Sequence, residues 1–405
     1  MRALVIAILL LGAGPGCDAP SDAPGEGGTH APDSGPSPDQ GVAGSQARLG
    51  VVVIDVQDLF VRYAAQKEID QIIDNIRSTL ALTAQHRTPL FVTFEDSKNR
   101  STGHGLPARL AGAIPAHARE FIKTTFAATG NKAFASAVRQ SGLTHLVVLG
   151  AETDVCVLQT ALGLRAMGFE VILQQDAVFT SEPNTAPALR RMRQAGVRMA
   201  SASEVQALAA GKAPLPAAEG GTIAIVKPLS IAVVLNRFDD AGLAGSSDPL
   251  GVAKHARLRE LLLISEWFDM PLYGAGSHTL PAKYGSLITK QIQPLESLAS
   301  AAGIEQIVVA GTDAGLAGLV QGLAKARDVF LVEDALLSSG AGDQPSTLEA
   351  LYNDASAVPI TYKSLYYGMT KSISLAEWPS KSWVDKDPVY YPKTRAPEDL
   401  PPMAD

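Results

Sequence analysis

Short apolar runs separated by helical stretches dominate residues 47–212 of this 405-residue chain. Continuous runs of this kind predict strands that are buried on both faces of a parallel sheet. Apolar spacing over 69–84 predicts a helix between two of these strands, and the alternation predicts helices on both faces of the sheet. The expected strands cover 49–56, 89–94, 146–149 and 171–173.

The same order of apolar runs returns after 213–222, a stretch of Pro, Gly and Ala that predicts a linker. Four blocks correspond in order and in chemistry, which predicts that 223–371 is a tandem second copy of the domain at 47–212. The expected fold class is therefore α/β, with two three-layer α/β/α domains on mostly parallel, Rossmann-like sheets. The expected strands of the second copy cover 231–236, 271–273, 307–313 and 329–335.

The two ends of the chain lack the pattern of a packed domain. Residues 1–16 resemble a signal peptide of the bacterial lipoprotein type, which predicts lipidation of Cys17; a plain secretory signal with an incidental cysteine is the alternative. Residues 17–46 are rich in Pro, Gly, Ser and Asp and predict a disordered tether. We therefore expect an exported protein of the cell envelope, anchored to a membrane surface by lipid. The tail at 372–405, rich in Pro, charge and aromatic residues, is expected to pack on a domain.

Composition narrows the classes of function. A net charge of −7 without a basic stripe argues against a nucleic-acid partner. The chain has only two cysteines, Cys17 and Cys156, and their different contexts do not indicate a disulfide framework. An unpaired Cys156 in the folded part of an exported protein suggests a reactive thiol.

Cys156 follows the apolar run at 146–149 and stands near the start of a helical pattern that stops at Gly168. The pattern places the thiol at a helix N-terminus, where free N–H groups and the helix dipole stabilise a thiolate. We therefore expect the pKa of this thiol to be lowered.

A carboxylate and a lysine accompany the thiol. Asp55 ends the first strand, at the edge where parallel α/β sheets bind ligands, and Lys123 precedes the strand that leads to Cys156. If they converge, the carboxylate can accept the thiol proton while the lysine stabilises the charges. Taken singly, each residue has an ordinary structural alternative: a helix cap, a surface lysine and a buried thiol.

Together, these residues resemble the isochorismatase-like cysteine hydrolase superfamily over 47–210. The resemblance rests on an Asp-x-Gln-x-x-Phe motif, a lysine and a Gly-x-x-Thr-x-x-Cys-Val motif. The matching residues are Asp55, Gln57, Phe60, Lys123, Gly150, Thr153, Cys156 and Val157.

The resemblance implies hydrolysis of an amide or related C–N bond of a small molecule through a thioester, without a cofactor. It also implies a cis peptide bond between Ala151 and Glu152. Three kinds of role follow from it: a catalytic triad of Asp55, Lys123 and Cys156, an oxyanion hole from the backbone N–H groups of Glu152 and Cys156, and substrate contacts at Gln57 and Phe60.

Nicotinamidases of this superfamily carry a metal site built from Asp and His just after the second strand. The corresponding stretch here, 93–98, has no histidine at the required spacing. His104 and His117 follow later and are expected at the surface. We therefore predict no metal site, which argues against nicotinamide as the substrate.

The second copy departs further from the family pattern. We expect it to be catalytically inactive and to occupy the place of a second subunit, as an internal pseudo-dimer; a homo-oligomer is compatible with this arrangement. Block alignment pairs Asp55 with Asn236, Cys156 with Gly315 and Lys123 with Lys283.

Two other functions stay open from the sequence. One is a membrane-tethered binding or scaffold protein without chemistry, which the intact triad of the first copy disfavours. The other is hydrolysis of a vinyl ether, as in isochorismatases proper, which the presence of Cys156 disfavours.

Overall fold

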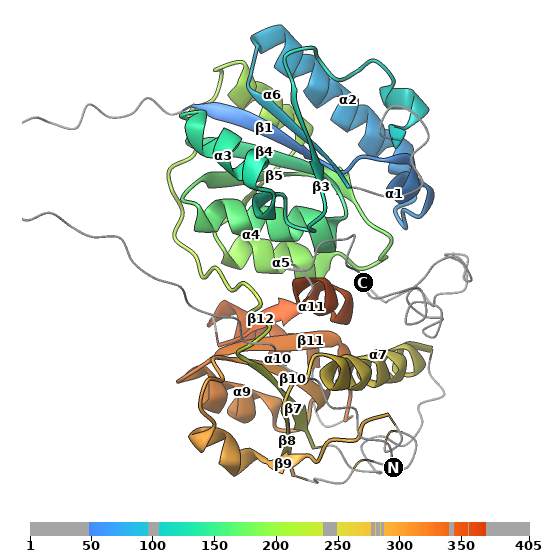
Figure 1. Ribbon diagram of the computed structural model, residues 1–405, viewed down its shortest axis with the longest axis vertical. Helices are drawn as coiled ribbons and strands as arrows, with labels where there is room; N and C mark the ends of the chain where they lie inside the picture. Colours follow the sequence, from blue (N-terminus) through green and yellow to red (C-terminus); the bar gives the residue numbers. More distant parts are fainter. Residues whose placement is uncertain are drawn as a thin grey trace, which may run out of the picture. The chain divides into compact units, whose positions relative to one another are not determined.

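The computed structural model contains two six-stranded parallel sheets within one compact unit that begins after residue 46 (Figure 1). No helix among the described residues is long and apolar enough to cross a membrane. The predicted signal peptide, the tether with Cys17, the tail, His104 and Lys283 all lie outside the described residues. The structure describes residues 48–95, 105–237, 249–276, 280, 284, 287–339, 344–354 and 356–369.

The first sheet has the strand order β3-β2-β1-β4-β5-β6, and all its ladders are parallel. Its strands are β1 (Leu49–Ile54), β2 (Leu90–Glu95), β3 (Arg119–Lys123), β4 (His145–Ala151), β5 (Glu170–Phe179) and β6 (Arg198–Ala200). Its helices are α1 (Asp58–Arg62), α2 (Ile69–His86), α3 (Lys132–Gln140), α4 (Leu158–Ala166), α5 (Ala186–Gln194) and α6 (Ala202–Ala209).

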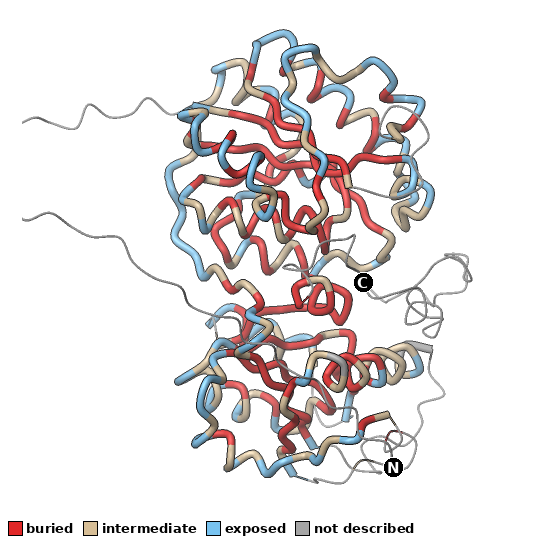
Figure 2. Tube along the Cα trace, in the orientation of Figure 1, coloured by how far each residue is buried: buried red, intermediate tan, exposed pale blue. Residues whose placement is uncertain are grey.

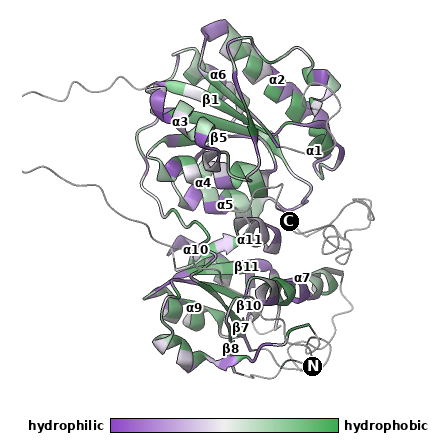
Figure 3. Ribbon diagram, in the orientation of Figure 1, coloured by the Kyte–Doolittle hydropathy of each residue, from purple (hydrophilic) through white to green (hydrophobic). Residues whose placement is uncertain are grey.

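Both faces of the first sheet are buried, which explains the continuous apolar run of β1. Val52 and Ile54 belong to the core cluster that contains α3, α4 and α5 residues, whereas Val51 and Val53 belong to the cluster that contains α2 and α6 residues. The strand therefore needs an apolar side chain at every position rather than at every second one. Figure 3 shows the resulting concentration of hydrophobic residues on the central strands.

The second sheet repeats the order of the first. It runs β12-β11-β10-β7-β8-β9, which is the first order with the strands renumbered and read from the other edge. Two copies of one three-layer α/β/α arrangement are thus present, as predicted, while a duplication as their origin stays a prediction. Its strands are β7 (Ile231–Asn236), β8 (Leu272–Ala275), β9 (Gln293–Pro294), β10 (Gln306–Thr312), β11 (Asp328–Leu337) and β12 (Val358–Ile360). Its principal helices are α7 (Pro249–Trp267), α9 (Leu316–Ala324), α10 (Gln344–Asn353) and α11 (Tyr362–Met369).

The sequence analysis missed four strands, and all four are sheet edges: β3, β6, β9 and β12. Edge strands pair on one side only and tend to be short or charged. The strand at 119–123 has charged residues at three of its five positions, and the other three strands have two or three residues each. None of them makes the continuous apolar run on which the prediction relied.

The strand register corrects one predicted pairing between the copies. In the first sheet, the residue before Asp55 pairs with Gly150; in the second sheet, Asn236 itself pairs with Gly311. Arg237, and not Asn236, therefore occupies the position of Asp55. The backbone agrees, because Asp55 and Arg237 both have left-handed φ angles, of 47° and 43°. The block alignment was shifted by one residue at the strand end.

Candidate active site

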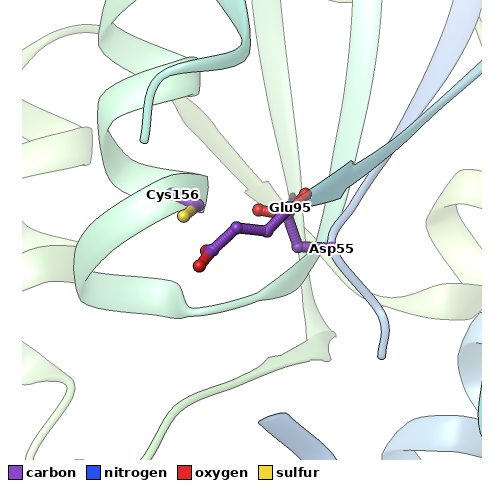
Figure 4. A group of neighbouring side chains, drawn as sticks. All are labelled: Asp55, Glu95 and Cys156. Atoms are coloured by element: carbon purple, nitrogen blue, oxygen red, sulfur yellow. The ribbon is translucent and has the colours of Figure 1, made fainter. Parts of the chain in front are cut away.

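Four polar side chains meet at the carboxyl edge of the first sheet. Asp55, Glu95, Lys123 and Cys156 stand at or just after the ends of β1, β2, β3 and β4, which are four neighbouring strands. From β1 the sheet continues to β2 and β3 on one side, and from β4 it continues to β5 and β6 on the other side. The order of the strands thus reverses between β1 and β4, and in doubly wound sheets such a switch point is where ligands bind. Figure 4 shows Glu95 extending between Asp55 and Cys156.

Asp55 and Lys123 form a fully buried ion pair. The Nζ atom of Lys123 lies 2.5 Å from Oδ2 of Asp55, and both side chains are 0% exposed. The hydroxyl of Thr93 donates to Oδ1 of Asp55 at 2.8 Å, and Nζ of Lys123 also donates to the carbonyl of Thr125 at 3.1 Å. The ordinary alternative of a surface lysine is therefore wrong.

Lys123 also reaches the thiol. Its Nζ atom lies 3.5 Å from Sγ of Cys156, so one ammonium group contacts both the carboxylate and the sulfur. Burial by itself lowers the pKa of Lys123, but attraction by Asp55, Cys156 and Glu95 outweighs it and raises that pKa above its ordinary value of 10.5. The lysine is thus a permanent cation at neutral pH.

The expected lowering of the Cys156 pKa is wrong for the resting site. Cys156 lies in a buried π-helical turn, Thr153–Val157, that precedes α4. Burial raises the pKa of this thiol well above its ordinary value, and the opposing effect of Lys123 is too small to reverse it. The sequence indicated the helix start correctly, but it did not show that the turn is buried in the core.

Gly150 gives β4 its close approach to β1. Its φ angle is 117°, and a Cβ atom built on it would lie 2.0 Å from the carbonyl oxygen of Ile54. Only glycine fits here, because any side chain would overlap the neighbouring strand. The first residue of the second family motif is therefore set by the packing of the two strands that carry Asp55 and Cys156.

The turn after Gly150 has the expected cis peptide bond between Ala151 and Glu152. The N–H groups of Val155 and Val157 donate to the carbonyl oxygen of Glu152 at 3.1 and 3.0 Å, which closes the turn. The predicted oxyanion donors, the N–H groups of Glu152 and Cys156, thus stand at the two ends of one compact segment. Their role in binding an oxyanion stays a prediction.

Glu95 is a site residue that the sequence analysis missed. Its carboxylate, that of Asp55 and the sulfur of Cys156 place one donor atom each within 4.8 Å of one another. Such a group could hold a cation, but the ammonium of Lys123 already lies against two of the three groups. The signal for Glu95 was available, since it ends its strand as Asp55 ends β1.

Gln57 and Phe60 were predicted as substrate contacts. The buried amide of Gln57 accepts from the N–H of Glu95 at 2.8 Å and donates to its carbonyl at 3.3 Å. Gln57 therefore holds the backbone of Glu95 in place. Phe60 is half-buried on α1 and packs against the core of the sheet. A contact of either residue with substrate stays a prediction. His117 is exposed, as expected, and one of its ring nitrogens hydrogen-bonds the carbonyl of Thr88 at 3.0 Å.

The corresponding edge of the second sheet has different chemistry. The position of Asp55 is occupied by Arg237, whose Nη2 would lie 3.5 Å from a Cβ atom built on Gly315. The Asn236 amide donates to the carbonyls of Thr312 and Ala314 at 2.7 and 3.0 Å. This edge therefore has the guanidinium of Arg237 and the hydrogen-bonded amide of Asn236 where the first sheet has the carboxylate of Asp55.

The fold and the site define the first half as a Rossmann-like α/β domain with a thiol, a lysine and two carboxylates at its switch point. Residues 50–204 match the model of the isochorismatase domain family. These residues are therefore an isochorismatase-like domain, in agreement with the resemblance of their motifs.

Known relatives are similar to about two fifths of the chain. Isochorismatase family protein 2A of Dictyostelium discoideum is 28% identical over 167 residues, which is 40% of this chain and 82% of that protein. Among solved structures, the YcaC gene product of Escherichia coli, described as an octameric hydrolase of unknown specificity, is 26% identical with a TM-score of 0.36, over 40% of this chain and 78% of its own. The MAR1 ribonuclease of Caenorhabditis elegans is 22% identical with a TM-score of 0.37, over 41% and 82%.

Proposed function

We propose that this protein is a cysteine hydrolase that cleaves an amide or related C–N bond of a small molecule. The observation that carries the proposal is the contact of one buried ammonium, that of Lys123, with both the Asp55 carboxylate and the Cys156 sulfur. A buried ion pair costs desolvation energy and is weak evidence for stability. Its contact with a nucleophile instead fits a catalytic use.

In the first step, Asp55 accepts the proton of Cys156, and the thiolate attacks the carbonyl or imidate carbon of the substrate. Lys123 stabilises the thiolate as it forms, which matters because burial keeps the resting thiol protonated. The tetrahedral oxyanion accepts hydrogen bonds from the backbone N–H groups of Glu152 and Cys156, and such donors typically contribute ~3 kcal/mol.

In the second step, the nitrogen leaving group takes the proton from Asp55 and departs as ammonia or an amine, leaving a thioester on Cys156. Asp55 then deprotonates a water molecule, which attacks the thioester carbon and releases a carboxylic acid and the free thiol. Formation of the thioester and its hydrolysis thus use the same three side chains, those of Asp55, Lys123 and Cys156.

The test is a screen of small amides for release of ammonia or amine, with wild type, Cys156→Ala and Asp55→Ala in parallel. Loss of turnover in both variants, with a thioester trapped on Cys156 of the wild type, supports the proposal. Activity on a vinyl ether that survives Cys156→Ala but not Asp55→Ala would indicate the isochorismatase reaction instead. A wild type that binds a ligand without turnover, and whose thiol does not react, would indicate a scaffold.

We also propose that the protein is exported and anchored to the cell envelope by a lipid on Cys17. The lipoprotein-like pattern of residues 1–17 supports this. Metabolic labelling with an alkyne fatty acid should label the wild type and leave Cys17→Ser unlabelled. Equal labelling of both would contradict the anchor.

A further inference from the structure

A charged side chain of the second half of the chain contacts the segment from Glu152 to Cys156 in the first half, which we call the nucleophile turn. Lys363, on α11, has a side chain that is only 7% exposed. Its Nζ atom lies 3.1 Å from Oε1 of Glu152, 3.5 Å from Oδ1 of Asp154 and within 3.2 Å of the hydroxyls of Thr180 and Ser181. A buried lysine is rare unless it is paired, so this site is built around its charge.

The carboxylates that Lys363 meets belong to the turn that holds Cys156. Glu152 follows the cis peptide bond, and Asp154 stands two residues before the nucleophile. The next residue of α11 also contributes, because the hydroxyl of Ser364 donates to the backbone carbonyl of Asp154 at 2.8 Å. Adjacent residues of α11 thus hold both the side chains and the backbone of this segment.

The two copies differ at this position in a way that singles out Lys363. The helices α6 and α11 are equivalent, because each begins with a backbone N–H that donates at 2.8 Å to a strand aspartate, Asp176 in one copy and Asp334 in the other. Counting from these caps, Lys363 corresponds to Ser203, which is exposed. By contrast, α11 is buried along nearly its whole length, as its red colour in Figure 2 shows. The equivalence of the helices therefore explains neither the charge nor the burial of Lys363.

Electrostatics give the contact a consequence for the thiol. Burial is the largest effect that raises the pKa of Cys156, Asp55 and Glu95 raise it further, and Glu152 adds a smaller effect in the same direction. Burial also raises the pKa of Glu152 itself, but attraction by Lys363 and hydrogen bonds from Ser181 outweigh it, so that carboxylate is ionised at neutral pH. A cation beside Glu152 offsets the negative charge that the thiolate would otherwise meet.

We propose that Lys363 is a positioning residue for the hydrolase site: it fixes the turn from Glu152 to Cys156 and neutralises that turn's carboxylate charge. The inactive second half then supplies a part of the working site. The proposal rests on the proposed function for its biological use, but its test reads the turn and the thiol directly and needs no substrate.

The experiment compares full-length wild type, Lys363→Met, Lys363→Arg and the double variant Glu152→Gln/Lys363→Met. Iodoacetamide alkylation is followed from pH 6 to 10 by peptide mass spectrometry, so that Cys156 is counted separately from Cys17. Lys363→Met should raise the apparent pKa of Cys156 and slow its alkylation at pH 8 by about tenfold, which is the rate change for one pKa unit. Lys363→Arg should keep most of the wild-type rate.

The double variant separates charge from packing. Because it removes both charges of the pair, it should recover most of the wild-type rate, whereas a role in packing alone would leave it as slow as Lys363→Met. A double variant as slow as the single one would overturn the charge argument. The matched control is Lys290→Met, which breaks an ion pair with the exposed Asp269 in the same half and should leave the rate unchanged.

Amide hydrogen exchange supplies a second readout that does not depend on thiol reactivity. In Lys363→Met, exchange of the peptide spanning 150–158 should be at least tenfold faster, while the α2 amides stay protected. Unchanged exchange in that peptide would overturn the positioning role. A wild-type thiol that is inert at every pH, together with faster exchange in Lys363→Met, would instead contradict the proposed function and leave the positioning role standing.

Discussion

The buried pair of Lys123 and Asp55 makes a sharp prediction about stability. Replacing Lys123 by Met keeps the length of the side chain and removes only its charge. The Asp55 carboxylate, which is 0% exposed, then loses the cation that lies 2.5 Å from it in the wild type. Breaking a buried ion pair in this way typically costs about 3–5 kcal/mol of the free energy of unfolding.

The double variant Asp55→Asn/Lys123→Met removes both charges. It should recover most of the loss, because a neutral amide can still accept the hydrogen bond from Thr93. Urea denaturation followed by circular dichroism measures all the variants. The control is Arg109→Met, since the Arg109 pairs with Asp70 and Asp74 are exposed to water and should add little stability.

The pH dependence of the loss also has a defined sign. The folded pKa of Lys123 lies above its ordinary value of 10.5, so its contribution is fully present below pH 10.5 and is lost only as pH rises through the higher folded value. The titration of Lys123 should therefore add no pH dependence to the stability of the wild type between pH 6 and pH 9. A loss below about 1 kcal/mol, or a double variant no more stable than the single one, would refute a tightly coupled buried pair.

Three further predictions concern other parts of the molecule. Gly150→Ala should lower the free energy of unfolding by more than ~3 kcal/mol, whereas Gly168→Ala, which has open space around it at a φ of 90°, should cost only ~1 kcal/mol in the same urea assay. Burial raises the pKa of Asp334 from 3.8 to about 6. The protonated side chain therefore stabilises the fold below pH 3.8, and this contribution of ~3 kcal/mol to the free energy of unfolding is lost as pH rises to about 6. A plot of the free energy of unfolding against pH should lack this change in Asp334→Asn. Glu95→Gln removes a negative charge that raises the pKa of Cys156, so its alkylation at neutral pH should become faster, and a slower rate would show that Glu95 helps to form the thiolate.

Much of the fold was predictable, and the reason is burial. Interior strands such as β1 and β10 are covered on both faces, so their central residues form an apolar run that is visible in the sequence. Edge strands carry no such requirement. That is why β3 was missed, although it ends at Lys123 and delivers that side chain to the site.

Part of the site was predictable, because polar residues at the carboxyl ends of neighbouring parallel strands meet at one edge of the sheet. Asp55, Lys123 and Cys156 were expected to converge, and they do. The pKa of Cys156 was not predictable, because it depends on how deeply the turn is buried, which is a property of the packed core. The role of Lys363 was equally hidden, since 207 residues separate it from Cys156 and nothing local to α11 indicates what that helix contacts.

The second half lacks the carboxylate of the first at its sheet edge, yet it contributes to the first half. Arg237 occupies the position of Asp55 at that edge, so a guanidinium stands where the first half has a carboxylate. The helix α11 nevertheless places a buried cation against two carboxylates of the other half. Removing that cation would leave buried negative charge beside the nucleophile, which is strongly destabilising. The family match ends at residue 204, but the turn that carries Cys156 is contacted by a buried lysine well beyond it.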